Sequence, residues 1–227
     1  MNTTHLLIGL IALAGCATVS GTVGSRDTVV FFGDSITEQG AQPGGYVSLI
    51  RDSLTQRYPG IQIVGAGISG NKVTDLEQRL DRDVLAKHPT VVVIYIGIND
   101  VWHSVLPNLH GTPIGAYEQK LTGIIRKIQA SGARVVLCTP SVVGEKRNGE
   151  NQLDAKLDEY SGVSRKIAEE TGSALCDLRK DFGAYETAHN VQDVDRGILT
   201  VDAVHLSPQG NKFVAQEIIS VLLRNGN

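Results

Sequence analysis

Short runs of apolar, β-branched residues alternate along the chain with segments in which apolar residues recur every three or four positions. The apolar runs are continuous, which is typical of strands buried on both faces of a sheet. We expect five such strands, at residues 27–32, 61–66, 90–96, 133–138 and 173–178. We expect helices between and after them, at residues 46–54, 76–85, 114–130, 153–170 and 208–222. Strands that alternate with helices predict a parallel α/β sheet with right-handed crossovers.

The same order predicts where a functional site would lie. In an open parallel sheet, the loops that follow the carboxyl ends of the strands build the site. Two longer loops, residues 101–113 and 141–152, follow the third and fourth expected strands.

The first residues differ from the rest of the chain, because residues 1–25 contain no Lys, Arg, Asp or Glu. Residues 6–15 are an apolar run that is too short to span a bilayer, which takes about 20 residues, and that fits the core of a secretory signal. The run ends at Cys16, and Leu-Ala-Gly-Cys resembles the lipobox of bacterial lipoproteins. The resemblance implies cleavage before Cys16 and lipid attachment to it. An ordinary cleaved signal and a buried helix are the alternatives.

These features predict a division into a signal peptide (residues 1–15), a flexible tether (16–26) and one folded domain (27–227). The predicted location is outside the cytoplasm. The protein would be held on a bacterial membrane by its lipid, facing the periplasm or on the outer membrane, or secreted if Cys16 carries no lipid.

Composition narrows the function. The 227 residues carry a net charge of −3, which disfavours a nucleic-acid binder. Aromatic residues make up only 5%, which speaks against a long stacking platform for sugars or bases. Three cysteines are too few for a disulfide scaffold. Cys138 and Cys176 fall in neighbouring expected strands, where two buried thiols are favoured and a disulfide remains open.

Four polar blocks follow or could return to the expected carboxyl ends of the strands. They are Gly-Asp-Ser-Ile at 33–36, Gly-Ile-Ser-Gly-Asn at 67–71, Gly-Ile-Asn-Asp at 97–100 and Asp-Ala-Val-His at 202–205. Each block alone has an ordinary alternative, a turn or a helix start. Together they supply a hydroxyl nucleophile, a base with an orienting carboxylate, and N–H donors for an oxyanion, which is the set that acyl transfer requires.

In this order and spacing the blocks resemble the SGNH/GDSL hydrolase family, over residues 27–224. The resemblance implies a flavodoxin-like three-layer α/β/α sandwich with five parallel strands in the order 2-1-3-4-5. It also implies roles: Ser35 as nucleophile, His205 as base and Asp202 as the acid beside it. Ser35, Gly70 and Asn99 would form the oxyanion hole.

The resulting hypothesis is a serine esterase that cleaves short-chain or acetyl esters, among them esters of a carbohydrate, without a cofactor or metal. An O-acetyltransferase or transacylase, or a lysophospholipase or thioesterase, could use the same site. A non-enzymatic surface lipoprotein on this fold is the remaining alternative. Trp102 and His103 follow the Asn99 block closely and either line the acyl or alcohol pocket or lie away from it.

Overall fold

A computed structural model describes residues 22–224, so the predicted signal at 1–15 and the predicted lipid site Cys16 lie outside the described residues. Five parallel strands form one sheet in the order β2-β1-β3-β4-β5. They are β1 (Thr28–Gly33), β2 (Gln62–Gly67), β3 (Val91–Tyr95), β4 (Arg134–Cys138) and β5 (Ala174–Cys176). The predicted fold class and strand order are therefore confirmed.

Five of the described α-helices match the predicted ones. They are α2 (Tyr46–Arg57), α3 (Val73–Asp83), α5 (Ile114–Ala130), α6 (Asp154–Thr171) and α8 (Pro208–Leu222). A short 3₁₀ turn, Leu85–Lys87, follows α3. Ser207 caps α8 by accepting a hydrogen bond from the Gly210 N–H, and Pro208 occupies its first turn.

Three further helices were not predicted: α1 (Ser35–Gly40), α4 (Ile98–Trp102) and α7 (Leu178–His189). α1 has a single apolar side chain, Ile36, so no apolar residue recurs in it. α4 places Ile98 and Val101 three positions apart, but it is only five residues long. α7 did leave a signal, because Leu178 and Phe182 are buried one turn apart. Asp177 caps this helix by accepting from the Lys180 N–H, which is why the fifth strand ends at Cys176 and not at residue 178.

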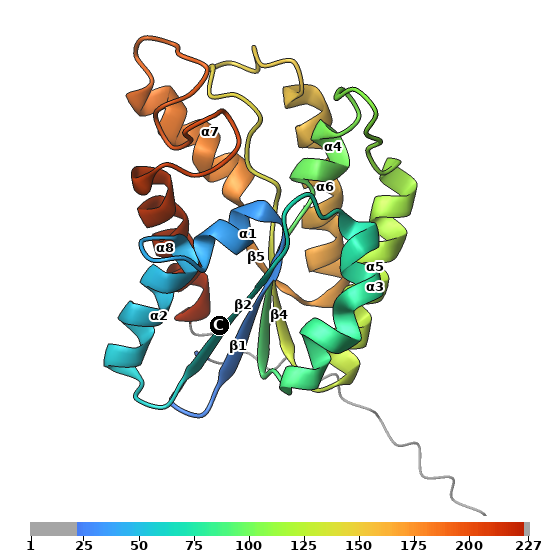
Figure 1. Cartoon of the computed structure of the whole chain (residues 1–227), viewed down its shortest axis with the longest axis vertical. Coiled ribbons are helices and arrows are strands. Elements are labelled where there is room, and N and C mark those ends of the chain that lie inside the picture. Colours follow the sequence, from blue (N-terminus) through green and yellow to red (C-terminus); the bar gives the residue numbers. More distant parts are fainter. Residues whose placement is uncertain (1–21, 225–227) are drawn as a thin grey trace, which may run out of the picture.

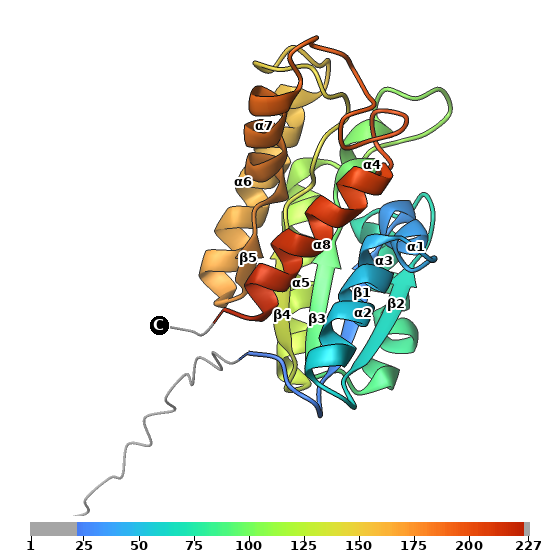
Figure 2. The ribbon, with the colours of Figure 1, turned by 90° about the vertical axis from the view of Figure 1, so that its left-hand side faces the viewer.

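The helices form a layer on each face of the sheet (Figures 1 and 2). α2 and α8 pack together on one face, and α3, α5 and α6 pack side by side on the other. β1 and β3 run through the middle of the sheet, and almost all of their residues are buried. Cys138 and Cys176 lie directly opposite each other on β4 and β5, and both are free, buried thiols.

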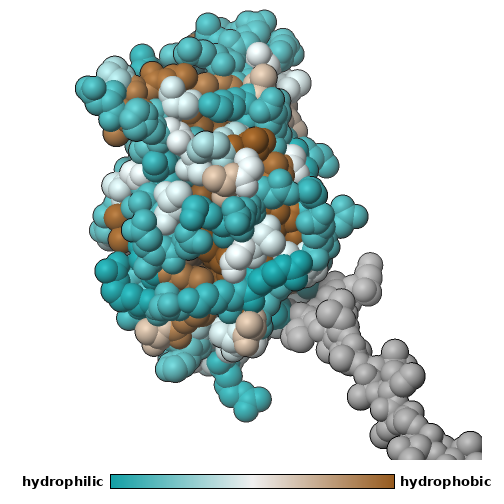
Figure 3. All heavy atoms as spheres, turned by 90° about the vertical axis from the view of Figure 1, so that its right-hand side faces the viewer, coloured by the Kyte–Doolittle hydropathy of each residue, from teal (hydrophilic) through white to brown (hydrophobic). Residues whose placement is uncertain are grey.

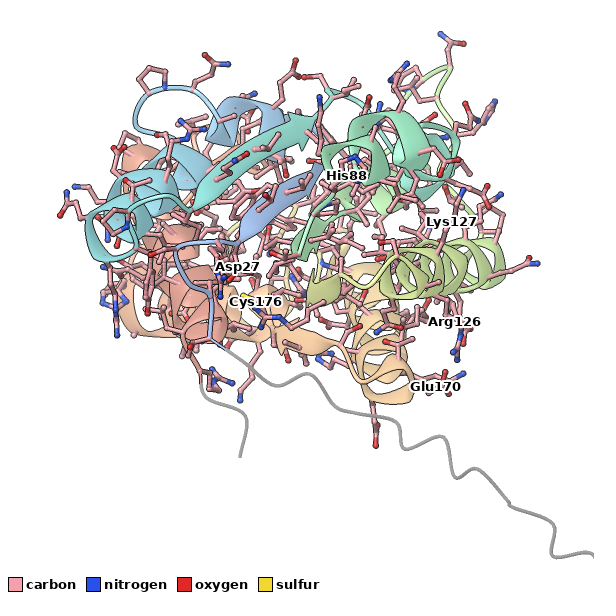
Figure 4. The ribbon with its side chains drawn as sticks, turned by 90° about the horizontal axis from the view of Figure 1, so that it is seen from below. Asp27, His88, Arg126, Lys127, Glu170 and Cys176 are labelled. Atoms are coloured by element: carbon pink, nitrogen blue, oxygen red, sulfur yellow. The ribbon has the colours of Figure 1, made fainter. Side chains whose placement is uncertain are left out.

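The chain enters the sheet at the edge opposite the carboxyl ends of the strands. Figure 4 looks onto this edge, where Asp27 precedes β1. The Asp27 carboxylate accepts hydrogen bonds from the Gly24 N–H and the Thr90 hydroxyl, at 2.7 and 2.6 Å. Val23 is buried and donates its N–H to Leu222 O at 3.2 Å. The folded part therefore includes residues 23–26, which the sequence assigned to a flexible tether, because one apolar side chain finds a place in the core.

The outer face built by α3, α5 and α6 is largely hydrophilic (Figure 3). Ion pairs link its helices in sequence: Lys120 of α5 pairs with Glu77 of α3, and Lys166 of α6 pairs with Glu118 of α5. No helix within residues 22–224 is long and apolar enough to cross a membrane.

Candidate active site

Ser35 lies where β1 ends and α1 begins, at the carboxyl edge of the sheet. The preceding Asp34 caps α1, and its carboxylate accepts a hydrogen bond from the Ile36 N–H at 3.0 Å. Ser35 is 8% exposed, so its hydroxyl sits at the surface of a packed turn. The strand-to-helix turn thus fixes the backbone on both sides of the hydroxyl.

A chain of hydrogen bonds joins Ser35 to His205 and Asp202. Ser35 Oγ lies 2.9 Å from His205 Nε2, and His205 Nδ1 lies 2.7 Å from Asp202 Oδ2. The carboxylate therefore holds the ring with its proton on Nδ1, which leaves Nε2 free to accept the proton of Ser35. The structure brings together the three residues that the sequence singled out.

The Asp202 carboxylate also organises the turn that carries His205. Its Oδ1 accepts the N–H groups of Val204 and His205, at 3.1 and 2.7 Å. Partial burial would raise the pKa of the Asp202 carboxyl, but the hydrogen bonds from His205 and from the Val204 N–H outweigh it and hold the pKa below its usual value. Asp202 is consequently ionised at neutral pH, as a partner of an imidazolium must be.

The two residues predicted as further oxyanion donors, Gly70 and Asn99, follow the carboxyl ends of β2 and β3. Asn99, in the first turn of α4, is 3% exposed and donates one amide hydrogen to Asn71 O at 3.0 Å. This bond orients the amide and leaves its second hydrogen for a ligand. Gly70 has φ +77°, a conformation that side chains other than glycine rarely adopt, and its N–H has no acceptor among residues 22–224.

The segment that carries Gly70, residues 67–71 (the oxyanion loop), is held from two helices. Glu38 of α1 accepts hydrogen bonds from the N–H and the hydroxyl of Ser69. Arg79 of α3 donates to Asn71 Oδ1 at 2.6 Å, and also to two carbonyl oxygens, Ala66 O at 2.9 Å and Gly33 O at 2.6 Å. The guanidinium thereby ties the ends of β1 and β2 to the oxyanion loop.

Arg79 and Glu38 were missed at the sequence level. Both side chains bind mainly backbone atoms at strand ends that are distant in sequence. Because every residue has these backbone atoms, the sequence does not indicate the contacts. The sequence indicates that Arg79 is a polar position on an amphipathic helix, but its side chain is only 6% exposed. Its guanidinium also stacks over the Phe32 ring at 4.5 Å.

Two buried carboxyl groups lie behind the serine. Burial, opposed by the Ile36 N–H and reinforced by nearby Asp100, raises the pKa of Asp34 to about 7. Burial likewise raises the pKa of Asp100 to about 6, although the Val73 N–H donates to its carboxylate. Part of the Asp34 population is therefore protonated at neutral pH, which limits the negative charge next to Ser35.

Trp102 is the last residue of α4 and His103 is its C-cap, and both side chains are partly buried. No contact joins either ring to Ser35 or His205 within the described chain, so their place in a substrate pocket stays a prediction. No group of three or more His, Cys, Asp or Glu side chains in residues 22–224 is arranged to hold a metal ion.

The family model described as "GDSL-like Lipase/Acylhydrolase family" matches residues 31–213, which include all four polar blocks. The chain belongs to this family. It is accordingly a carboxylic ester hydrolase, as the sequence predicts.

Several relatives share most of their length with the chain. An acetylxylan esterase of Geobacillus stearothermophilus is 32% identical over 87% of this chain and 94% of its own. The isoamyl acetate-hydrolyzing esterase 1 homolog of Mus musculus is 27% identical over 86% of this chain and 80% of its own. The crystal structure of the acetyl xylan esterase AlAXEase superimposes with a TM-score of 0.83 at 44% identity, covering 85% of this chain and 98% of that one.

Proposed function

We propose that this protein removes acetyl groups from a small carbohydrate, such as a xylo-oligosaccharide, through an acyl-enzyme on Ser35. The observation that carries the proposal is the hydrogen-bonded chain Ser35–His205–Asp202 at the carboxyl edge of the sheet. The names of the relatives point to acetyl esters, of xylan in two cases and of a small alcohol in another.

In the proposed mechanism, His205 Nε2 takes the Ser35 proton as Oγ attacks the ester carbonyl. The tetrahedral oxyanion receives hydrogen bonds from the Ser35 and Gly70 N–H groups and from the Asn99 amide. His205 then gives its proton to the leaving alcohol oxygen. Water repeats the sequence: it attacks the acyl carbonyl, loses a proton to His205 and releases the acid, while Ser35 regains its hydrogen.

The catalytic assignment has support from a relative. Three solved structures of the Geobacillus enzyme are described as catalytic mutants, in which a serine, an aspartate or a histidine is replaced by alanine. Their aspartate and histidine stand three positions apart, like Asp202 and His205. Because the relatives are named as ester-hydrolysing enzymes, water is favoured over a sugar as the final acceptor, and transacylase and thioesterase activities are not favoured.

Replacing Ser35 by alanine tests the nucleophile. We expect Ser35→Ala to abolish hydrolysis of p-nitrophenyl acetate and of acetylated xylo-oligosaccharides, with the fold unchanged by circular dichroism. Ser220→Ala, which alters an exposed serine of α8, is the matched control and should retain full activity. Turnover by Ser35→Ala at the rate of the wild-type enzyme would refute the mechanism. Turnover of longer acyl chains in preference to acetyl would refute the proposed substrate.

We further propose that the chain is exported and anchored by lipid on Cys16, with residues 1–15 removed. The motif Leu-Ala-Gly-Cys supports this, and so does the position of Val23 at the sheet edge opposite Ser35, from which a short tether would let the active site face away from a membrane. Labelling with radioactive palmitate in a bacterial host should depend on Cys16, and Cys16→Ala should release the protein from membranes. A Cys16→Ala protein that stays membrane-bound would contradict the anchor.

A further inference from the structure

Glu145 is a fully buried carboxylate on the loop between β4 and α6 (residues 139–153). It accepts three backbone hydrogen bonds from one short segment. The N–H of Ile198 binds Oε2 at 2.8 Å, and those of Leu199 and Thr200 bind Oε1 at 2.5 and 2.8 Å. That segment ends two residues before Asp202.

The backbone of the β4–α6 loop makes further bonds to the same region. The Gly144 N–H donates to Ala203 O at 2.8 Å, inside the turn that joins Asp202 to His205. The Glu145 N–H donates to Asp195 O at 2.9 Å, and Asn190 Nδ2 donates to Glu145 O at 2.6 Å. Figure 1 shows the two segments together at the carboxyl end of the sheet.

The 202–205 turn needs such support. Ala203 has φ +80°, a region that residues with a side chain rarely occupy, so the turn persists only where its surroundings fix it. Local contacts supply part of the support: the Val201 N–H binds His205 O, and the Ser207 N–H binds Leu199 O. The Glu145 carboxylate binds residues 198–200, which lie just before this turn in the chain.

A buried carboxylate is strongly held when several backbone N–H groups point at it, since charge-assisted bonds are about twice as strong as neutral ones. A second buried acid nearby is Glu186 of α7, which is 4% exposed and whose Oε1 has no partner in residues 22–224. Burial, and then the charge of Glu145, raises the pKa of Glu186 to about 8, so Glu186 stays mostly neutral at pH 7. The three N–H donors of residues 198–200 thus converge on the Glu145 carboxylate, around which this segment is ordered.

We propose that Glu145 is a positioning residue for the esterase reaction: its carboxylate anchors the backbone at 198–200 and thereby holds His205 in line between Asp202 and Ser35. The proposal rests on the function proposed above. Glu145 touches neither Ser35 nor His205, so its effect on the rate passes through the geometry of the 202–205 turn.

The test is Glu145→Gln, which keeps the shape and one acceptor oxygen but replaces the other oxygen with an NH₂ group. This group cannot accept a hydrogen bond and would oppose the Ile198 N–H if the amide oxygen keeps the Leu199 and Thr200 donors. We expect kcat on p-nitrophenyl acetate to fall about 10- to 100-fold with KM within about threefold, the size expected when a reacting group is slightly misplaced. The downfield proton NMR signal of His205 Nδ1–H, identified by its loss in Asp202→Ala, should weaken or vanish. Glu150→Gln alters an exposed glutamate of the same loop, and it should leave the signal and kcat unchanged.

A folded Glu145→Gln protein with wild-type kcat and an intact Nδ1–H signal would overturn the proposal, even if its melting temperature fell. If Glu145→Gln does not fold, Glu145→Asp replaces it and is judged by the same two readouts. If the wild-type protein hydrolyses no acetyl ester, the proposed function fails by that result alone. The NMR comparison then still decides whether Glu145 positions His205.

Discussion

Two side chains assigned to the site, His205 and Asn99, are each oriented by a neighbour. Asp202 orients the His205 ring, and Asn71 O orients the Asn99 amide. Because the partners are fixed before any substrate arrives, the donors cost little reorganisation when charge develops on the substrate oxygen. The residue-level consequence is that Asn99 should act on the transition state and not on binding.

Asn99→Ala should therefore lower kcat by about 10²- to 10³-fold with little change in KM, the usual loss for one oxyanion donor. Steady-state kinetics on p-nitrophenyl acetate would measure both constants. Labelling of Ser35 by a fluorophosphonate should slow as well, because that reaction develops charge on an oxygen at the same place. A variant that raised only KM would show that Asn99 binds substrate instead.

At the scale of elements, the oxyanion loop depends on a helix that contributes no reacting group. Arg79 of α3 donates to Asn71 Oδ1, Ala66 O and Gly33 O, and burial lowers the pKa of its guanidinium while its pairing with Asp83 opposes this. A guanidinium can satisfy several acceptors at once because its donors are planar and fixed. Truncation would remove a donor from each of these three oxygens, and Gly33 O would keep a second donor, the Ile68 N–H.

We expect Arg79→Met to destabilise the fold by about 3–5 kcal/mol, the cost of removing one partner from a buried charged network, measured by urea denaturation. Arg82→Met is the matched control on the same helix. Arg82 is exposed and pairs only with the neighbouring Asp83, so its loss should change stability little. Equal effects of the two substitutions would refute the role given to Arg79.

At the scale of the whole molecule, three buried carboxyl groups hold protons to unusually high pH. The pKa is raised by burial to about 7 in Asp34, to about 6 in Asp100 and to about 8 in Glu186. In the unfolded chain these groups lose their protons near pH 4. Between about pH 4 and the raised pKa of each group, the folded state therefore binds more protons than the unfolded state. The free energy of unfolding consequently falls as the pH rises through this range.

The free energy of unfolding should consequently decline between about pH 5 and pH 8 and level off above it. Glu186→Gln removes the highest of the three titrations and should flatten the upper part of the decline, on the order of a few kcal/mol for a shift this large. Urea titrations at pH 5, 6, 7, 8 and 9 would measure this. An identical slope in wild type and Glu186→Gln would contradict the assignment.

Much of the architecture could be predicted because its signals are local. Continuous Val and Ile runs mark strands buried on both faces, and apolar residues at helical spacing mark α2, α3, α5, α6 and α8. α1 and α4 escaped because they are single turns whose start is set by the strand before them. Val23 escaped because its environment is made by Leu222, at the other end of the chain.

The sequence by itself determined the alternation of strands and helices and the family, and it singled out the serine, histidine and aspartate that the structure joins by hydrogen bonds. The roles of Gly70 and Asn99 stay predictions. Motifs of a few residues suffice for these, because each block forms one turn. Tertiary structure alone decided that Ser35 and His205, 170 positions apart, meet at 2.9 Å. It also decided that Arg79, Glu38 and Glu145 hold the turns that carry the site. Most of these supporting hydrogen bonds are made to backbone atoms. Because every residue has such atoms, no pattern of residue types predicts the bonds.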